Sequence, residues 1–273
     1  MLTINEIKDY FALENSHAKK ELGQNFLVKP IIAANIVESL KIKETDNVLE
    51  IGPGLGSLTE LIIDKVQNFT VCEYDQKFVN YLNKAFENKN VKIVKNNILK
   101  FDDCSFNKVL GNLPYYITTD IIEFVTTKFS NLEQAVFMIQ KECLERIKSV
   151  EGKSFNALNV YLMLSFKIRT LFTVKKSNFF PIPGVDSIVF SLDRIKEADL
   201  NFNKSVYKVA KILFSNRRKT ISNNLKGLVH RNEDLLEVLK SLGLEANLRA
   251  EELKLNDYVN LTKMLLNLKI ISW

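Results

Sequence analysis

The segment NVLEIGPGLG, residues 47–56, predicts a buried strand that runs directly into a glycine-rich turn. Because glycine has no Cβ, a ligand can approach the backbone of such a turn, and a following helix would offer free N–H groups there. Outward from this segment, apolar runs alternate with helical periods, which predicts a mostly parallel sheet covered by helices. The expected strands are 47–51, 70–73, 91–95, 108–111, 134–139, 169–174 and 187–192, and the expected helices are 31–40, 57–66, 75–86, 119–127, 141–149 and 155–165.

The two ends of the chain differ from this alternating pattern. The N-terminus is predicted to be a polar arm, and beyond the polar segment 193–204 strand signals largely stop while helical periods take over. We therefore expect an α/β domain over residues 1–195, arm included, and a small all-helical domain over residues 196–273. Two stripes at helical spacing predict the core of the second domain: Leu235, Leu236, Leu239 and Leu242, then Leu261, Met264, Leu265 and Leu268.

Composition narrows the class of protein. The chain has 273 residues, 46% of them hydrophobic, and a net charge of +6, with no acid between Gly152 and Val185 or between Lys204 and Lys226. Acid-free basic stretches, with Arg217, Arg218 and Lys219 at the centre of the second, indicate a polyanionic partner. The alternative is an ordinary solvated surface of a lysine-rich protein.

Several common classes are disfavoured. The three cysteines are scattered and form no CxxC pair, so we expect no metal site and no disulfide framework. No apolar run of about 18 residues occurs, and the N-terminus has no apolar signal core, so we expect a cytoplasmic protein without a membrane partner. His17 and His230 lack nearby partner residues, so catalysis is expected to depend on positioning.

A nucleoside cofactor fits the residues around the turn. Glu73 follows Gly52 by 21 residues, at the end of an expected strand, where an acid accepts hydrogen bonds from ribose hydroxyls. The side-chain amide of Asn97 could form hydrogen bonds with the edge of an adenine. Alternatively, Asn97 is merely a turn residue. A nicotinamide dinucleotide fits less well, because the glycines follow GxGxG and not GxGxxG, and no basic residue stands ready for a pyrophosphate. S-adenosylmethionine, which has no phosphates, fits better, with Gly52 and Gly54 in the turn near its amino-acid end.

The residues Asn112-Leu113-Pro114-Tyr115 follow another expected strand and can hold a flat amine. The Asn112 side-chain oxygen and the Leu113 carbonyl can accept the two amine hydrogens, and Tyr115 can offer its ring face to the base. Pro114 fixes φ and brings no competing N–H donor. The alternative is a turn that merely closes a strand.

These motifs, taken in order, resemble the KsgA/RsmA ribosomal RNA adenine dimethyltransferase family. The matching strings are 19–27 (KKELGQNFL), 50–59 (EIGPGLGSLT), 112–115 (NLPY), 140–142 (QKE), 179–187 (FFPIPGVDS), 217–219 (RRK) and 249–251 (RAE). The resemblance implies a Rossmann-like class I S-adenosylmethionine-dependent methyltransferase sheet with a C-terminal helical domain that binds RNA. It places the cofactor contacts on Asn25, Leu27, Gly52, Glu73, Asn97 and Asn112. It also suggests that Tyr115 and Phe179 sandwich the target base, although Phe179 could instead be a core aromatic.

Position 97 departs from the family pattern. The family usually has Asp where this chain has Asn97, and Gly where it has Asn96, so we expect weaker cofactor binding without loss of activity.

The resemblance implies dimethylation at N6 of two adjacent adenosines near the 3′ end of small-subunit ribosomal RNA. We expect small-subunit ribosomal RNA and the pre-30S particle as partners, and a monomer is the default expectation. One alternative is the related group that methylates large-subunit ribosomal RNA and confers macrolide resistance, against which the residues 53–56 and 249–251 argue. Another is a non-catalytic assembly or transcription factor on the same fold. The intact Asn25, Gly52, Glu73 and 112–115 motif argue against that loss of catalysis.

Overall fold

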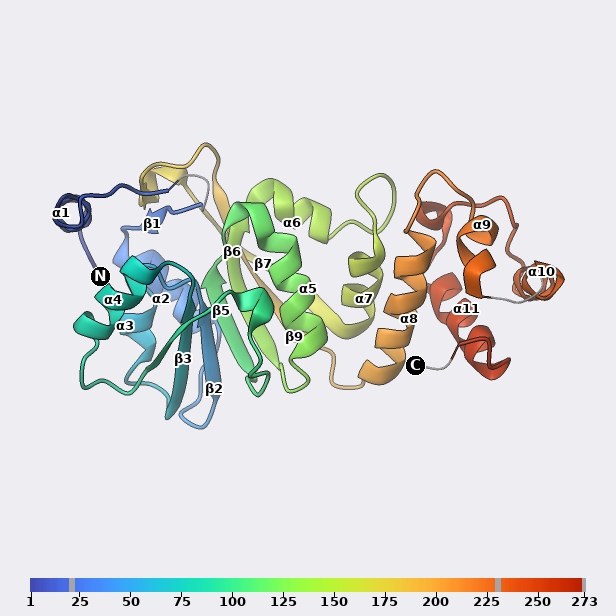
Figure 1. Cartoon of the computed structure of the whole chain (residues 1–273), viewed down its shortest axis with the longest axis horizontal. Coiled ribbons are helices and arrows are strands. Elements are labelled where there is room, and N and C mark those ends of the chain that lie inside the picture. Colours follow the sequence, from blue (N-terminus) through green and yellow to red (C-terminus); the bar gives the residue numbers. More distant parts are fainter. Residues whose placement is uncertain (20–22, 229–231, 272–273) are drawn as a thin grey trace. The chain divides into compact units, whose positions relative to one another are not determined.

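A computed structural model describes residues 1–19, 23–228 and 232–271, so Lys20, Glu21 and Leu22 of the first motif, and His230, lie outside the described residues. A seven-stranded sheet has the order β4-β3-β2-β5-β6-β9-β7 (Figure 1). The strands from β4 to β6 pair in parallel, and β9 pairs antiparallel with β6. The strands are β2 (Asn47–Ile51), β3 (Asn68–Glu73), β4 (Lys92–Lys95), β5 (Lys108–Asn112), β6 (Gln134–Gln140), β7 (Phe166–Val174) and β9 (Ser187–Arg194). The predicted α/β class is confirmed.

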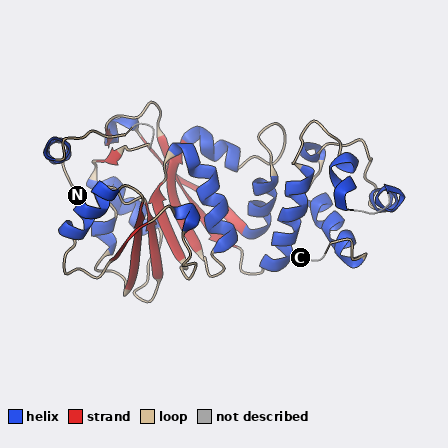
Figure 2. Ribbon diagram, viewed as in Figure 1, coloured by secondary structure: helices blue, strands red, loops and turns tan. Residues whose placement is uncertain are grey.

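Helices alternate with the strands in the first part of the chain (Figure 2). They are α1 (Ile4–Leu13), α2 (Pro30–Ser39), α3 (Thr59–Ile62), α4 (Gln76–Ala85), α5 (Thr118–Lys128) and α6 (Lys141–Ile147). Pro30 is the first residue of α2 and Asp75 caps α4 through Lys77 N–H, which agrees with the helices expected over 31–40 and 75–86.

The polar N-terminal arm contains helix α1, which was not predicted from the sequence. Thr3 and Glu6 form a reciprocal capping box at its start. Ile7 and Phe11, one helical turn apart, are buried in a cluster with Phe78, so tertiary packing stabilises a helix whose other positions are mostly polar.

A second sheet pairs two strands of two residues each. Strand β1 (Phe26–Leu27) lies antiparallel to β8 (Phe179–Phe180), with Phe26 opposite Phe180 and Leu27 opposite Phe179. Sequence periodicity cannot show strands this short, because two residues complete only one alternation. The pairing fixes the segment after α1 against a loop about 150 residues later in the chain.

The chain divides into two compact units. The first contains Met1–Leu144 and Lys167–Arg194, and the second contains Glu145–Phe166 and the described residues after Arg194. The single boundary expected near residue 195 is therefore wrong for 145–166, because a helix of this segment packs against α8 and Asn203 donates hydrogen bonds to Leu164 O and Ser165 Oγ (3.1 Å each). The helices of the second unit are α7 (Ala157–Ser165), α8 (Leu200–Leu213), α9 (Ile221–Leu225), α10 (Asn232–Ser241) and α11 (Leu255–Asn267).

The predicted core stripes of the second unit are only partly right. The buried members are Leu235, Leu239, Leu261 and Leu265. Leu236 and Leu268 are instead 49% and 53% exposed, because each lies beside the buried row of its helix and not on it. Within the described part of the chain, no helix combines the length and the apolar character that crossing a bilayer requires.

Candidate functional site

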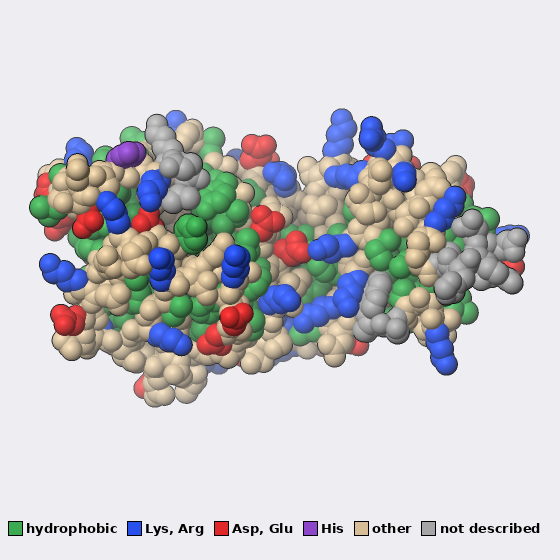
Figure 3. All heavy atoms as spheres, viewed as in Figure 1, with side chains coloured by type: hydrophobic (Ala, Val, Ile, Leu, Met, Phe, Trp, Pro, Cys, Tyr) green, Lys and Arg blue, Asp and Glu red, His purple; other side chains and the backbone are tan. Residues whose placement is uncertain are grey.

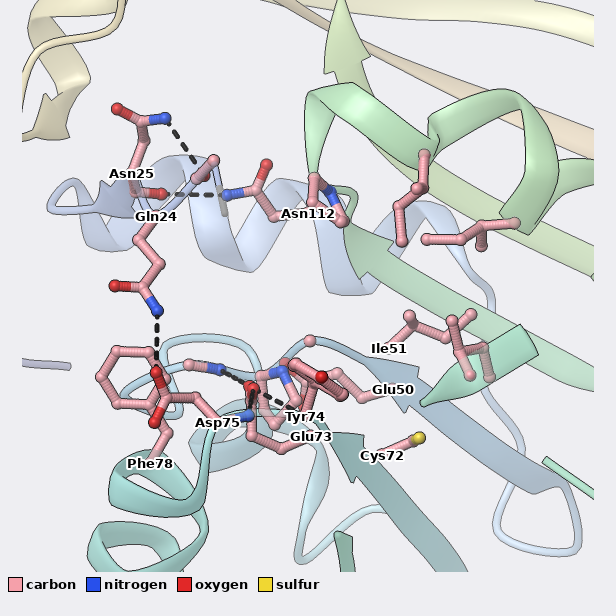
Figure 4. A pocket seen from close by; sticks show the side chains of 18 of the residues that line it. Gln24, Asn25, Glu50, Ile51, Cys72, Glu73, Tyr74, Asp75, Phe78 and Asn112 are labelled. Atoms are coloured by element: carbon pink, nitrogen blue, oxygen red, sulfur yellow. Dashed lines mark hydrogen bonds between the residues drawn. The ribbon is translucent and has the colours of Figure 1, made fainter. Parts of the chain in front are cut away.

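A cavity of about 410 Å³ opens where the parallel strands β2, β3 and β5 end (Figure 4). Carboxyl ends of parallel strands meet at one edge of a sheet, which is where α/β proteins bind ligands. All the residues predicted to contact a cofactor line this cavity: Asn25, Leu27, Gly52, Gly54, Glu73, Asn97 and Asn112. The structure thus brings together residues from five separate segments of the chain.

The backbone conformation of the turn after β2 requires glycine. Gly52, Gly54 and Gly56 all have positive φ, at +64°, +57° and +80°. A Cβ on Gly56 would lie 2.8 Å from Cε2 of Phe86, so this glycine also allows close packing. The helix expected over 57–66 is limited to the four residues of α3, so a long helix with its N-terminus at the turn is not formed.

Glu73 is held by the backbone around it. Its Oε1 accepts the N–H groups of Tyr74 and Asp75 (2.8 Å each), and its Oε2 accepts Gly54 N–H (3.1 Å). A carboxylate has about four lone-pair positions, so these three bonds leave roughly one for a ligand. Burial raises the pKa of Glu73, and the three N–H donors oppose that shift.

Glu50 is a second buried carboxyl in the cavity wall. Thr59 Oγ1 donates to its Oε2 at 2.7 Å, and burial raises its pKa to about 8. Glu50 has one hydroxyl donor where Glu73 has three amide donors, so Glu73 is the better placed of the two to ionise. Of the two carboxyl groups, Glu73 is therefore the one suited to accept a hydrogen bond from a ligand hydroxyl.

We expect Glu50→Gln to flatten the pH dependence of stability. A folded-state pKa raised from 4.5 to about 8 gives a stabilising contribution that is complete below 4.5 and lost as pH rises toward about 8. The free energy of unfolding of the variant minus that of the parent should therefore be roughly 2 to 5 kcal/mol more positive near pH 8.5 than near pH 4.5. Urea unfolding of parent and variant at both pH values measures this, with the exposed Glu38→Gln as control. Parallel stability curves for parent and Glu50→Gln would contradict the assignment.

Asn97 caps the short 3₁₀ helix Ile98–Lys100, and its Oδ1 accepts Leu99 N–H at 3.0 Å. The turn role is compatible with the predicted ligand role, because Asn97 also lines the cavity. An amide has one oxygen, whereas a carboxylate has two. Because Leu99 N–H already donates to Asn97 Oδ1, only the second lone pair of that oxygen is left to accept from an adenine amine. The amide Nδ2 remains as a donor that the family's Asp lacks.

The side chain of Asn112 is oriented by the segment that leads into β1. Its Nδ2 donates to the Asn25 carbonyl at 3.1 Å, and Asn25 Nδ2 in turn donates to the Gly23 carbonyl at 3.1 Å (Figure 4). Gly23 has φ +64°, and a Cβ there would lie 3.3 Å from Tyr115 N. With its N–H donor engaged, Asn112 presents Oδ1 as its acceptor in the cavity wall.

The neighbours of Asn112 are fixed by different contacts. Leu113 is buried, and its N–H donates to Met138 O at 3.0 Å, which extends the contact between β5 and β6. Tyr115 is half-buried, with its Oη 3.4 Å from Ser187 Oγ, and burial raises its pKa. Neither lines the cavity, whereas Pro114 and Tyr116 do. The roles proposed for Leu113 and Tyr115 thus remain predictions.

Phe179 does not have the exposed ring that stacking on a base requires. It is 1% exposed and packs in the core cluster that contains Leu27 and Val174. Its pairing opposite Leu27 in the two-stranded sheet turns the side chain into that core. The structure corrects the stacking assignment in favour of the alternative, a core aromatic.

Sequence reasoning missed several residues of the cavity. Tyr74 and Tyr116, 61% and 55% exposed, both line it, and each directly follows a residue that was singled out. Asp75 accepts from Lys19 Nζ (2.7 Å) and Gln24 Nε2 (3.3 Å), which ties the segment before β1 to the start of α4. Gln24 lies within the motif at residues 19–27, and this motif is the sequence feature that could have indicated it.

Arg217 is engaged within the second unit. Its Nη1 and Nη2 donate to the carbonyls of Lys153 (2.8 Å) and Phe155 (2.7 Å), and its guanidinium lies over the Phe214 ring. Glu251 completes its surroundings at 3.9 Å from Nε. Arg217 therefore holds the segment before α7, and because its side chain is still 40% exposed, its predicted RNA contact stays a prediction.

Arg218 and Lys219, by contrast, are exposed, and Lys and Arg side chains are scattered over the face of this unit that Figure 3 shows. We expect Arg218→Ser with Lys219→Ser to weaken RNA binding and to reduce the salt slope of log K by about 1.8, since each phosphate contact contributes about 0.9. Binding titrations at several salt concentrations measure this. Arg217→Lys is the comparison variant, and it should lower the unfolding midpoint without changing the slope. An unchanged slope for the double variant would assign these residues to ordinary solvated surface.

The sheet order, the turn after β2, the acid at the end of β3 and the carboxamide at the end of β5 define the Rossmann-like class I methyltransferase fold. The sequence pattern of the family described as "Ribosomal RNA adenine dimethylase" matches residues 15–267. The chain belongs to this family.

Individual relatives agree with the family. The chain is 38% identical over 264 residues to the ribosomal RNA small subunit methyltransferase A of Malacoplasma penetrans, covering 94% of this chain and 95% of that protein. Its structure is similar to a dimethyladenosine transferase from Plasmodium falciparum, with a TM-score of 0.75, 25% identity, and coverage of 89% and 98%. The 23S rRNA methyltransferase ErmE shares the fold, with a TM-score of 0.64, 22% identity, and coverage of 88% and 99%.

Proposed function

We propose that this protein dimethylates N6 of two adjacent adenosines near the 3′ end of small-subunit ribosomal RNA, using S-adenosylmethionine. The observation that carries the proposal is the orientation of Asn112. Its Nδ2 is engaged by the Asn25 carbonyl, so its Oδ1 is the acceptor available at the end of β5, in the wall of a cavity that suits a nucleoside. The small-subunit enzymes among the relatives favour this substrate over large-subunit RNA.

The cavity residues fit this cofactor by their donor and acceptor chemistry. Glu73 offers a charged acceptor to a ribose hydroxyl, and Asn97 offers an amide to the adenine edge. Asn25, Leu27 and the Gly52–Gly54 turn surround the space left for the amino-acid end. The bound cofactor would supply a methyl group on a positively charged sulfur, with a leaving group that becomes neutral.

The residues of the chain act by positioning. Asn112 Oδ1 and the Leu113 carbonyl would accept the two amine hydrogens of adenine and direct the nitrogen lone pair along the line of transfer. Good alignment of this kind can supply up to roughly 7 to 11 kcal/mol. The surplus proton passes to water once methylation has made it acidic, so no strong base is needed. Tyr115 would contact the ring face of the extruded base.

Labelled-methyl transfer to immature small ribosomal subunits tests the proposal. The preferred substrate would be the pre-30S particle, bound by a monomer, and mass spectrometry of the product RNA should locate two dimethylated adenosines near its 3′ end. Large subunits from the same cells are the control. Label in large-subunit RNA would support the macrolide-resistance type instead, and no label in either would support a non-catalytic assembly factor.

A further inference from the structure

The loop between β8 and β9, residues 181–186, exposes two branched apolar side chains. Ile182 is 65% exposed and Val185 is 48% exposed, while Pro183 between them is buried. Single exposed apolar residues are normal, but two on one short loop beside a site suggest a contact surface.

Both ends of this loop are attached to the surroundings of the cavity. At its start, Phe180 pairs opposite Phe26 of β1, and Phe26 lines the cavity. At its end, Ser187 Oγ lies 3.4 Å from Tyr115 Oη, three residues from Asn112 along the chain. The loop therefore lies beside the place where a target base would enter.

The end of the loop is held firmly. Asp186 Oδ1 accepts Lys176 N–H (2.9 Å), its Oδ2 accepts from Lys175 Nζ (3.0 Å), and its carbonyl accepts Lys141 N–H (3.3 Å). These contacts fix the loop before any partner binds, which lowers the entropy cost of a contact there. Since no acid occurs between Gly152 and Val185, the sequence leading into the loop is basic and suits a phosphate backbone.

We propose that Ile182 and Val185 form an apolar wedge that contacts the bases next to the target adenosine. When that adenosine is extruded, the wedge fills the gap that it leaves in the base stack. The proposal rests on the function proposed above. An adenine must leave its stack to bring N6 to Asn112, and extrusion costs stacking and pairing energy. Apolar side chains inserted at a base step compensate for this in other nucleic-acid-binding proteins.

The test uses the full-length protein with Ile182→Ser and Val185→Ser, and undermethylated small ribosomal subunits. We expect the single-turnover rate of methyl transfer, with enzyme in excess, to fall about tenfold. The dissociation constant of S-adenosylmethionine should stay unchanged, and so should the salt slope of particle binding, because no charge is removed. The Ile182→Leu and Val185→Leu pair keeps the apolar surface and should retain the parent rate.

Ile31→Ser is the matched control, because Ile31 is 68% exposed on α2 and lies outside both the loop and the cavity lining. It should act like the parent. If the serine pair transfers methyl groups at the single-turnover rate of the parent, the wedge proposal is wrong. It is also wrong if the serine pair loses only affinity for the particle, because that result would indicate a docking contact. Failure of the parent itself to transfer methyl groups would instead overturn the proposed function.

Discussion

Replacing Asn112 by alanine is expected to lower the single-turnover rate of methyl transfer by at least about a hundredfold, as removal of one positioned polar group from a reaction centre commonly does. The variant loses the Oδ1 acceptor at the end of β5, so the adenine amine is no longer directed. It also loses the hydrogen bond to the Asn25 carbonyl, a net contribution of about 1 kcal/mol, so the dissociation constant of S-adenosylmethionine should rise only severalfold.

Asn112→Asp separates the two contributions of the side chain. It keeps an acceptor oxygen but places a second oxygen against the Asn25 carbonyl, where the parent has an N–H donor. We expect transfer well above that of the alanine variant, with weaker cofactor binding. Methylation by Asn112→Ala at the parent rate, in a folded protein, would exclude Asn112 from the mechanism.

Replacing Glu73 by glutamine should raise the dissociation constant of S-adenosylmethionine about 10- to 150-fold. Three backbone N–H groups already occupy most of the carboxylate, which leaves roughly one charged hydrogen bond to a ribose hydroxyl, worth about 1.5 to 3 kcal/mol. Glutamine also turns one acceptor into a donor, which disturbs the turn at Gly54 or at Tyr74 and Asp75. Isothermal calorimetry of parent and variant measures the change, and thermal unfolding without ligand controls for the altered turn.

The pH dependence of binding gives an independent check on Glu73. Only the ionised carboxylate is a full acceptor, so parent affinity should fall as pH falls through the pKa of Glu73. Burial raises that pKa, so the loss should begin at a higher pH than for an ordinary glutamate. The Glu73→Gln variant should lack this dependence. Equal affinities for parent and variant at every pH would remove the ribose assignment.

Local sequence identified the sheet and the part of the cavity formed by the glycine-rich turn, Glu73 and Asn97, and the family resemblance added Asn25, Leu27 and Asn112. Strands such as Asn47–Ile51 and Lys108–Asn112 are marked by short apolar runs, and Pro30 and Asp75 by their helix-start chemistry. In a parallel sheet the carboxyl ends of strands meet at one edge, so residues that follow those runs must converge. This is why Glu73 and Asn112 lie in one cavity, although the cofactor contact of Asn112 was expected only from the family resemblance.

Tertiary structure alone decided what surrounds each side chain. Phe179 and Arg217 belong to motifs that predicted ligand contacts, yet Phe179 is buried beside Leu27 and Arg217 binds the carbonyls of Lys153 and Phe155. Helix α1 and the one remaining acceptor position on Glu73 likewise depend on residues far away in the chain. Residue type and spacing determine which conformations and hydrogen bonds are available locally. The packing of distant segments decides which residues contact a given side chain, and whether an aromatic ring is exposed to solvent or buried in the core.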